Sequence, residues 1–191
     1  MKTKTIQINK DKNGKIQYLT EVLPMIPTNT ILYKTITGLG ATYGELKAER
    51  NSIIIELNLP VIAGKCRDPK HKDDNLLGVY EGVYTDDIIK YLEASKNKRI
   101  KILTTPESFW KIKDAFEMMD MDIYTTCFLL FDECHKIVKD VDYRWDVTLP
   151  FDDFFLFGEK ALVSATPITF SDPRFDRENF QIIKLEPAFE Y

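Results

Sequence analysis

The sequence predicts an α/β domain with a mostly parallel central sheet, because three apolar segments each end abruptly in polar or glycine-rich residues. Residues 127–131 (CFLLF) form a continuous apolar run that stops at residues 132–135 (DECH). A run this unbroken is typical of a strand buried on both faces, as in a parallel sheet. Residues 30–36 and 160–163 are two further predicted strands, and each is followed directly by its own polar motif.

Asp132 and Glu133 follow the central predicted strand and define the first candidate site. Ligands of open parallel sheets bind beyond the carboxyl ends of the strands, so two acids at this place face a site. One carboxylate can hold a magnesium ion through its water shell, while its neighbour polarises a water for attack on phosphorus. The alternative is a solvated acidic turn, which is the usual meaning of an isolated Asp-Glu pair. The motifs after the two other strands favour a site.

Length and composition indicate one globular domain. With 191 residues, of which 44% are hydrophobic and 29% charged, the chain can bury one full core. No stretch approaches about 18 consecutive apolar residues, and the N-terminus lacks the apolar region of a signal peptide. The three cysteines, Cys66, Cys127 and Cys134, lack CxxC spacing and are expected to be reduced thiols. We therefore expect a cytoplasmic protein that does not enter a membrane.

The remaining elements follow from periodicity and from helix-start and turn residues. Strands are expected over residues 30–36, 52–57, 76–83, 99–104, 127–131, 160–163 and 180–185. Helices are expected over residues 16–23, 45–50, 86–95 and 106–120. Residues 64–75 are charged and contain a proline, which predicts a mobile loop outside the sheet. Residues 1–29 are expected to be a polar and helical lead-in.

The segment after the strand at 30–36 is typical of a phosphate-binding loop. In such a loop, glycines let backbone N–H groups converge on phosphate oxygens, a lysine adds charge, and a Ser or Thr hydroxyl joins the magnesium shell. The glycines and the hydroxyl stand where the loop needs them, but an alanine occupies the position of the lysine. The candidate nucleotide-binding residues are Thr37, Gly38, Leu39, Gly40, Ala41 and Thr42.

Taken in order, the three motifs resemble motifs I, II and III of the superfamily 2 helicases of DEAD/DEAH type, with a degenerate first motif. Asp-Glu-Cys-His at 132–135 and Ser-Ala-Thr at 164–166 are the specific part of the resemblance. It implies a three-layer RecA-like P-loop NTPase domain over residues 30–186, the first lobe of such a helicase, with residues 187–191 beginning a linker. It also implies ATP and Mg²⁺ as cofactors.

The resemblance implies a role for each acid and hydroxyl. Asp132 takes the metal together with Thr42, and Glu133 orients the attacking water. Three further residues are expected to report the state of the nucleotide and to link hydrolysis to the nucleic-acid site: His135, Ser164 and Thr166.

Two segments resemble those that contact nucleic acid in this superfamily. Residues 58–61 take the place of motif Ia, and residues 105–109 take that of motif Ib. Thr105, Pro106 and Glu107 are also good helix-start residues, and both interpretations can hold together. The implied partners are DNA or RNA and a second RecA-like lobe, supplied in cis or in trans, for which the sequence has no room.

Net charge restricts how nucleic acid could be bound. A net charge of −4 argues against a protein that binds nucleic acid with its whole surface. Local basic clusters remain, and two of them, at 65–72 and 96–101, are far apart in the sequence. Such clusters are most often solvated faces.

The missing lysine is the most costly departure from the family. A hydrogen bond to a charged group contributes about 1.5–3 kcal/mol, so losing it would weaken nucleotide binding about ten- to a hundredfold. Lys34, just before the loop, and Lys47, in the segment after it, are two candidates for replacing the cation. Alternatively, both are ordinary surface lysines and the loop is a structural relic.

These inferences predict the nucleotide-binding lobe of a helicase- or translocase-like ATPase that acts on nucleic acid and needs a second lobe for hydrolysis. The alternative is a catalytically inactive pseudo-helicase, a scaffold that binds nucleic acid or protein. Ala41 favours the scaffold, whereas the intact acids and the Ser-Ala-Thr motif oppose it. A restriction or mobile-element translocase subunit has the same lobe, and sequence alone does not separate it from a helicase.

Overall fold

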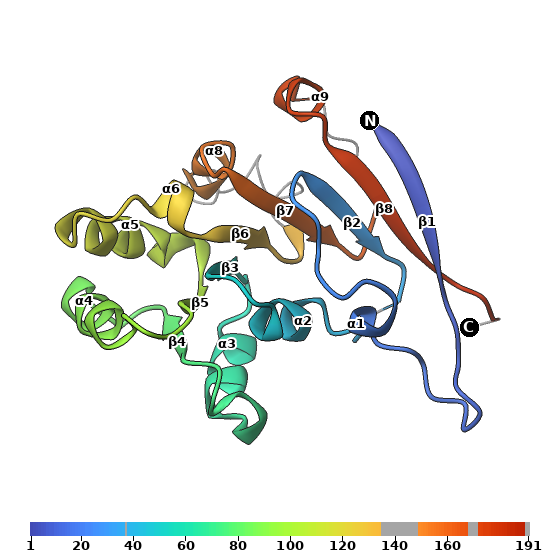
Figure 1. Cartoon of the computed structure of the whole chain (residues 1–191), viewed down its shortest axis with the longest axis horizontal. Coiled ribbons are helices and arrows are strands. Elements are labelled where there is room, and N and C mark those ends of the chain that lie inside the picture. Colours follow the sequence, from blue (N-terminus) through green and yellow to red (C-terminus); the bar gives the residue numbers. More distant parts are fainter. Residues whose placement is uncertain (37, 135–148, 168–171, 190–191) are drawn as a thin grey trace.

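One sheet of eight strands organises the chain (Figure 1). The computed structural model describes residues 1–36, 38–134, 149–167 and 172–189, and for residues 149–151 it describes the backbone alone. The strand order is β1-β8-β2-β7-β6-β3-β5-β4. The strands are β1 (Lys2–Ile8), β2 (Thr30–Lys34), β3 (Ser52–Ile55), β4 (Leu76–Val79), β5 (Lys101–Thr104), β6 (Phe128–Phe131), β7 (Glu159–Ser164) and β8 (Gln181–Pro187).

Every pairing between neighbouring strands is parallel. All the carboxyl ends of the strands therefore lie at the same edge of the sheet. This confirms the prediction of an α/β domain with a parallel sheet, and it brings segments distant in the sequence together at that edge.

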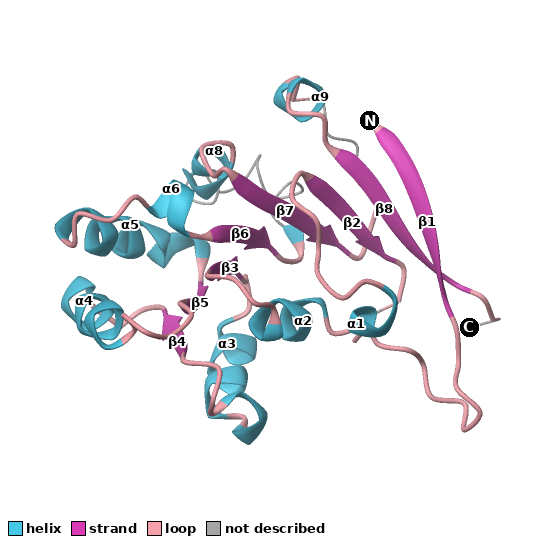
Figure 2. Ribbon diagram, viewed as in Figure 1, coloured by secondary structure: helices cyan, strands magenta, loops and turns pink. Residues whose placement is uncertain are grey.

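Helices cover both faces of the sheet and complete a three-layer arrangement (Figure 2). On one face, α1, α2 and α3 pack over one cluster of buried residues, and on the other, α4, α5, α6 and α8 pack over a second. The helices are α1 (Leu19–Val22), α2 (Ala41–Lys47), α3 (Leu59–Arg67), α4 (Thr85–Ala94), α5 (Phe109–Met118), α6 (Ile123–Thr126), α8 (Leu149–Phe154) and α9 (Arg174–Arg177), with 3₁₀ turns η1 (Pro69–His71) and η2 (Pro106–Ser108).

Strand β6 lies in the interior of the sheet, between β7 and β3, as its apolar run predicts. All four of its residues are buried, and they alternate between the two faces: Leu129 belongs to one cluster, and Phe128 and Leu130 to the other. Because side chains of successive strand residues point to opposite faces, a strand covered on both faces needs apolar residues throughout. The unbroken run is thus explained by its position.

Strand β1 was not among the predicted strands. Its sequence, KTKTIQI, is mostly polar, and five of its seven residues are exposed. It is nevertheless paired along its whole length with β8, at the edge of the sheet. Edge strands need no apolar face and often carry lysines that discourage pairing with other chains. The polar segment predicted as a lead-in, residues 1–29, therefore contains an edge strand of the sheet.

The prediction of a mobile loop over residues 64–75 was wrong, because much of this segment is helical. Helix α3 continues through Arg67, and η1 follows it. Pro60 lies in the first turn of α3, where its missing N–H costs nothing, and Ile62 is fully buried beneath the helix. The Asp68 side chain accepts a hydrogen bond from the Lys70 N–H and caps η1. Local capping thus orders a segment whose charge suggests a loop.

Lys101 fixes the far end of α2 to the sheet. Its side chain is 2% exposed, and Nζ donates hydrogen bonds to the Glu45 and Ala48 carbonyls and to Ser52 Oγ. A cation at a helix C-terminus satisfies carbonyls that lack partners within the helix. Lys101 is therefore a structural residue and not, as its place in the basic sequence cluster suggested, part of a surface.

The buried ammonium of Lys101 should make stability depend on pH. Burial lowers its pKa from 10.5 to about 8, although the Glu45 carboxylate acts in the opposite direction. Between those values the unfolded chain binds more protons than the folded one, so stability should rise with pH. We expect the melting temperature of the native chain to rise relative to that of Lys101→Met between pH of about 8 and 10. The exposed Lys98→Met is the control, and a native-like pH response of Lys101→Met would contradict the assignment.

Candidate functional site

The carboxyl ends of three adjacent strands bring the candidate residues together. Lys34 is the last residue of β2, Ser164 is the last of β7, and Asp132 directly follows β6. The register places Tyr33 opposite Ser164 and Phe131 opposite Leu162, so these ends lie nearly level. Helix α2 begins directly after the glycine loop and packs on one face of the sheet. Its second residue, Thr42, is the fourth member of the candidate site.

Asp132 is the centre of the site. It is 2% exposed and accepts three hydrogen bonds: from Thr42 Oγ1 at 2.5 Å, from Lys34 Nζ at 3.2 Å and from the Glu133 N–H at 2.9 Å. A buried carboxylate requires such partners, because desolvating it alone is costly. Thr42 and Asp132, the two residues expected to take the metal, are therefore in direct contact.

Glu133 has an unusual backbone conformation. Its φ is +55°, in the left-handed region, which costs a non-glycine residue on the order of 1–3 kcal/mol. Its Oε1 lies 2.7 Å from Lys34 Nζ. Such strain is concentrated at functional sites, and here it turns the glutamate so that its carboxylate meets the same ammonium as Asp132.

The structure distinguishes the two candidate lysines. Lys34 Nζ bridges Asp132 and Glu133, and its side chain is 11% exposed. Burial acts to lower its pKa, but the two carboxylates outweigh burial and raise the pKa above 10.5. Lys47, by contrast, binds both oxygens of Asp74 and the Lys70 carbonyl at 2.7–2.8 Å. Only Lys34 of this pair contacts the acids.

The glycine loop has the backbone that its sequence predicts. Gly38 and Gly40 have φ of +76° and +79°, where an L side chain would be strained. Leu39 is buried, and its carbonyl accepts a hydrogen bond from the Leu19 N–H at 2.9 Å, which ties the loop to α1. Ala41 begins α2 and is 3% exposed, in the apolar cluster beneath the loop. The residue in the lysine's place thus contributes to the core.

Ser164 and Thr166 form a compact turn after β7. Ser164 Oγ donates to the Thr166 carbonyl at 2.5 Å and accepts from the Thr166 N–H at 3.2 Å. The Cys134 thiol is also hydrogen-bonded to Ser164; burial, with the charge of Asp132, raises the pKa of that thiol. The second and third motifs are therefore linked through Cys134. The predicted link through His135 lies outside the described residues, as does Thr37 of the loop.

Oxygen ligands suited to Mg²⁺ are present. The carboxylate of Asp132 and the hydroxyl of Thr42 are hard ligands of the kind this ion prefers. Across the described ranges no group of three or more His, Cys, Asp or Glu side chains could hold a metal by itself. Magnesium at nucleotide sites is bound by one or two carboxylates and by the phosphates, so this small donor set fits it.

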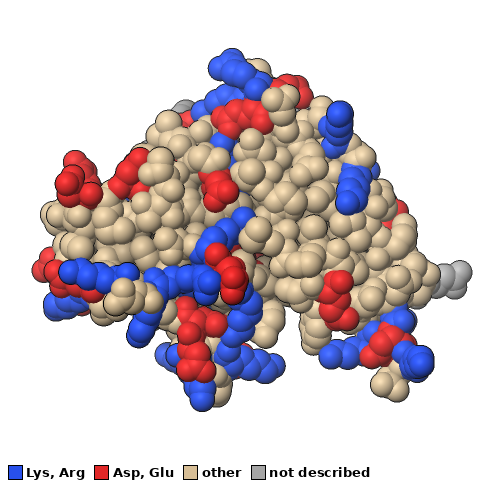
Figure 3. All heavy atoms as spheres, in the orientation of Figure 1, with Lys and Arg blue, Asp and Glu red and all other residues tan. Residues whose placement is uncertain are grey.

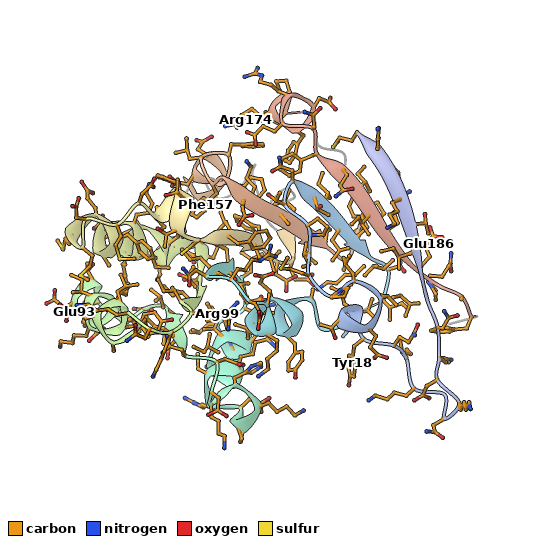
Figure 4. The ribbon with its side chains drawn as sticks, viewed as in Figure 1. Tyr18, Glu93, Arg99, Phe157, Arg174 and Glu186 are labelled. Carbon is orange, nitrogen blue, oxygen red and sulfur yellow. The ribbon has the colours of Figure 1, made fainter. Side chains whose placement is uncertain are left out.

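Tyr18 is a candidate site residue that the sequence did not indicate. Its ring lies beside the glycine loop, with Cδ1 3.8 Å from the place a Cβ on Gly40 would take, and the residue is 46% exposed (Figure 4). It directly precedes α1, and Lys15 Nζ lies 4.8 Å from the centre of its ring. No local pattern marks this tyrosine, because its position depends on how residues 9–19 return to the loop.

The two segments compared with motifs Ia and Ib follow β3 and β5, at the same edge as the acids. Asn58 precedes α3, and Leu59 and Val61 in its first turn are exposed. Thr105 precedes η2 with extended backbone but makes no side-chain capping hydrogen bond. The helix-start interpretation of Thr105 is thus confirmed in position, while its hydroxyl does not cap the helix.

The basic clusters lie at the opposite edge. The segment 65–72 ends α3 and forms η1, and residues 96–99 connect α4 to β5; Asn75 Nδ2 donates to the Arg99 carbonyl at 3.0 Å and joins the two. Figure 3 shows Lys and Arg side chains, interspersed with acids, along this lower part of the molecule, and Figure 4 labels Arg99 there. Lys47 and Arg99 are paired with Asp74 and Glu49. These cations do not line the acidic site.

Comparisons with known proteins support the fold. No protein-family profile matches the chain, and no curated protein matches its sequence. The structure resembles the crystal structure of the Hef helicase domain of Pyrococcus furiosus, with a TM-score of 0.51 and 12% identity over 86% of this chain. The match covers 36% of that domain, so the chain spans about a third of it. The fold is therefore the RecA-like α/β fold of a helicase domain.

None of the helices described here combines the length and the apolar character needed to span a bilayer.

Removing the central carboxylate should destabilise the protein strongly. Asp132→Ala leaves the Thr42 hydroxyl and one side of the Lys34 ammonium without their acceptor, and breaking a buried ion pair costs about 3–5 kcal/mol. Urea denaturation measures this change in the free energy of unfolding. Asp176→Ala is the control, since its ion pair with the N-terminus is exposed and should contribute less than about 1 kcal/mol. A similar small loss for both variants would contradict the central position of Asp132.

Proposed function

We propose that the chain binds a magnesium–nucleoside triphosphate, ATP in the first instance, at the carboxyl edge of the sheet, as one lobe of a helicase- or translocase-like ATPase. The observation that carries this proposal is the hydrogen bond from Thr42 Oγ1 to Asp132 directly beneath the glycine loop. A hydroxyl at the start of a helix, paired with an acid at the end of a buried strand of the same sheet, is how a P-loop site holds its metal.

The chain's own groups would divide the work. Backbone N–H groups of residues 38–42 receive the phosphates, because the left-handed glycines leave that backbone open. Thr42 and Asp132 would hold Mg²⁺, which would neutralise part of the charge of the phosphates. Glu133 would orient a water, and the turn of Ser164 and Thr166 would link the acids to neighbouring segments.

Tyr18 extends the proposed site beyond the phosphates. An exposed aromatic ring beside a phosphate loop offers a face on which a base can stack, with a contribution of about 1–3 kcal/mol by analogy with nucleic-acid platforms. Leu19, the next residue, is hydrogen-bonded to the loop. The base and the phosphates would then be held by a single local unit of α1 and the loop.

Nucleic acid is proposed to bind at the same edge, over the segments that follow β3 and β5. The Thr105 hydroxyl makes no capping hydrogen bond, which leaves it suited to a phosphate of a bound strand. Because β6 pairs with β3 and β3 with β5, a change at the acids is adjacent in the sheet to these segments. Such adjacency provides the physical basis for coupling the two ligands.

Hydrolysis is proposed to need a second RecA-like lobe, in cis or in trans, to close over the phosphates. The chain corresponds to about a third of the helicase domain it resembles, which supports this view. The cytoplasm, where Mg-nucleotide is available and the buried thiols of Cys127 and Cys134 stay reduced, is the proposed compartment.

A second candidate is the inactive scaffold, which binds its partners without turnover. It is favoured by one observation: Ala41 packs into the core where the loop lysine is expected. The ordered contacts of Asp132, Glu133 and Thr42 favour a functional nucleotide site. The two candidates differ in whether binding of a partner depends on nucleotide: a scaffold should bind its partners equally well with and without Mg-ATP.

Calorimetric titration with Mg-ATP tests the proposal. We expect the native chain to bind, and Asp132→Asn, which keeps the shape of the side chain, to bind at least about tenfold more weakly through loss of a charged metal ligand. Binding of a labelled single-stranded oligonucleotide, measured by fluorescence anisotropy, should also change when Mg-ATP is added. No binding by the native chain at millimolar ATP, with binding restored in Ala41→Lys, would instead establish the scaffold.

A further inference from the structure

We propose that Lys34, from the end of β2, supplies the cation that the glycine loop lacks, and that its ammonium contacts the β- and γ-phosphates of the bound nucleotide. The inference rests on the proposed nucleotide site and names the group that completes it. In this arrangement the essential lysine precedes the loop and reaches the phosphates from the sheet, whereas in an ordinary loop it stands in the first turn of the following helix.

The strand order explains why a residue of β2 reaches the acids. Strand β7 lies between β2 and β6, so the two strands are two spacings, or about 10 Å, apart. The Lys34 side chain extends across the carboxyl end of β7 to Asp132 at 3.2 Å and Glu133 at 2.7 Å. Its ammonium therefore lies beyond the ends of all three strands, where ligands of parallel sheets bind.

The loop and the ammonium share one partner. Thr42 Oγ1 binds one oxygen of Asp132, and Lys34 Nζ binds the other. A phosphate chain seated on the loop and sharing a metal with Thr42 must therefore pass close to Lys34. The cation is already inside the site and needs no movement of the backbone to meet the phosphates.

The charges in the site favour a shift of the Lys34 ammonium from the carboxylates to the phosphates when nucleotide binds. Two carboxylates and one ammonium leave a net negative charge, which the site can tolerate poorly when triphosphate arrives. With a divalent cation on the Asp132 carboxylate, the acids no longer depend on Lys34 as their counter-charge. A lysine has a flexible four-carbon stem, so its ammonium can turn from carboxylate to phosphate oxygens.

Lys47, the other lysine considered as a replacement for the loop cation, lies too far from the loop to contact the phosphates. Lys47 ends α2, so it lies about 9 Å along the helix from the loop, at a rise of about 1.5 Å per residue. Its ammonium binds Asp74 and the Lys70 carbonyl at the opposite edge of the sheet. Lys47→Met is therefore a matched control, because it removes the other lysine near the loop in the sequence, one that binds Asp74 and not Asp132 or Glu133.

The test compares a nucleotide that carries β- and γ-phosphates with one that lacks them. Affinities of the native chain, Lys34→Met and Lys47→Met for Mg-ATP and for AMP are measured by calorimetry. We expect Lys34→Met to weaken Mg-ATP binding about ten- to a hundredfold and AMP binding by less than about threefold, since a hydrogen bond to a charged group contributes about 1.5–3 kcal/mol. Lys47→Met should leave both affinities unchanged.

Two further variants keep the test decisive if Lys34→Met does not fold. Lys34→Gln can still donate to Asp132 and should show the same selective loss for Mg-ATP, whereas Lys34→Arg keeps the charge and should retain more affinity. Adding Ala41→Lys to either neutral variant should restore Mg-ATP binding, because the cation returns by the usual route. Melting temperatures show whether each variant is folded.

The outcomes separate this inference from the function on which it rests. Equal losses for Mg-ATP and AMP would show that Lys34 only maintains the fold, and an unchanged Mg-ATP affinity would show that it does not contact the phosphates; either overturns the inference alone. A native chain that binds no Mg-ATP overturns the proposed function as well.

Discussion

The buried carboxylate of Asp132 is the constraint on which the site depends. It accepts hydrogen bonds from Thr42 and Lys34, which are 90 and 98 residues away in the sequence, and from the N–H of its own neighbour. A carboxylate that is 2% exposed must be paired, so β6, β2 and α2 can pack only in a way that supplies these donors. The same contacts that satisfy the charge also assemble the loop, the acids and a lysine at one edge.

The parallel sheet separates the molecule into two edges of different character. At the carboxyl edge, the acids, the glycine loop and the segments after β3 and β5 lie together. At the amino edge lie the basic segments that end α3 and α4, partly neutralised by Asp74 and Glu49. Helix α2 connects the edges, since Thr42 in its first turn binds Asp132 while Lys101 holds its last carbonyls. The fold alone does not define a function, so the assignment depends on the carboxyl edge.

Much of the fold could be predicted because the buried strands carry their own signal. Phe128–Phe131 is apolar throughout since both faces are covered, and the loop glycines are required by positive φ. Strand β1 could not be predicted, because an edge strand needs no apolar pattern and owes its place to β8. The nearness of Thr42 and Asp132 was implied only by the helicase resemblance, which gave both residues to one metal, and the structure shows them in direct contact. The choice between Lys34 and Lys47 required the strand order, with β7 between β2 and β6, which no local pattern contains.

The most direct measurement is the crystal structure of the chain with Mg²⁺ and a non-hydrolysable ATP analogue. The decisive quantity is the distance from Lys34 Nζ to the nearest β- or γ-phosphate oxygen. We expect a hydrogen-bond distance of about 3 Å, with Thr42 and Asp132 at the metal. A bound nucleotide whose phosphates contact Lys47, or whose phosphates lie away from a Lys34 still bridging Asp132 and Glu133, would contradict it.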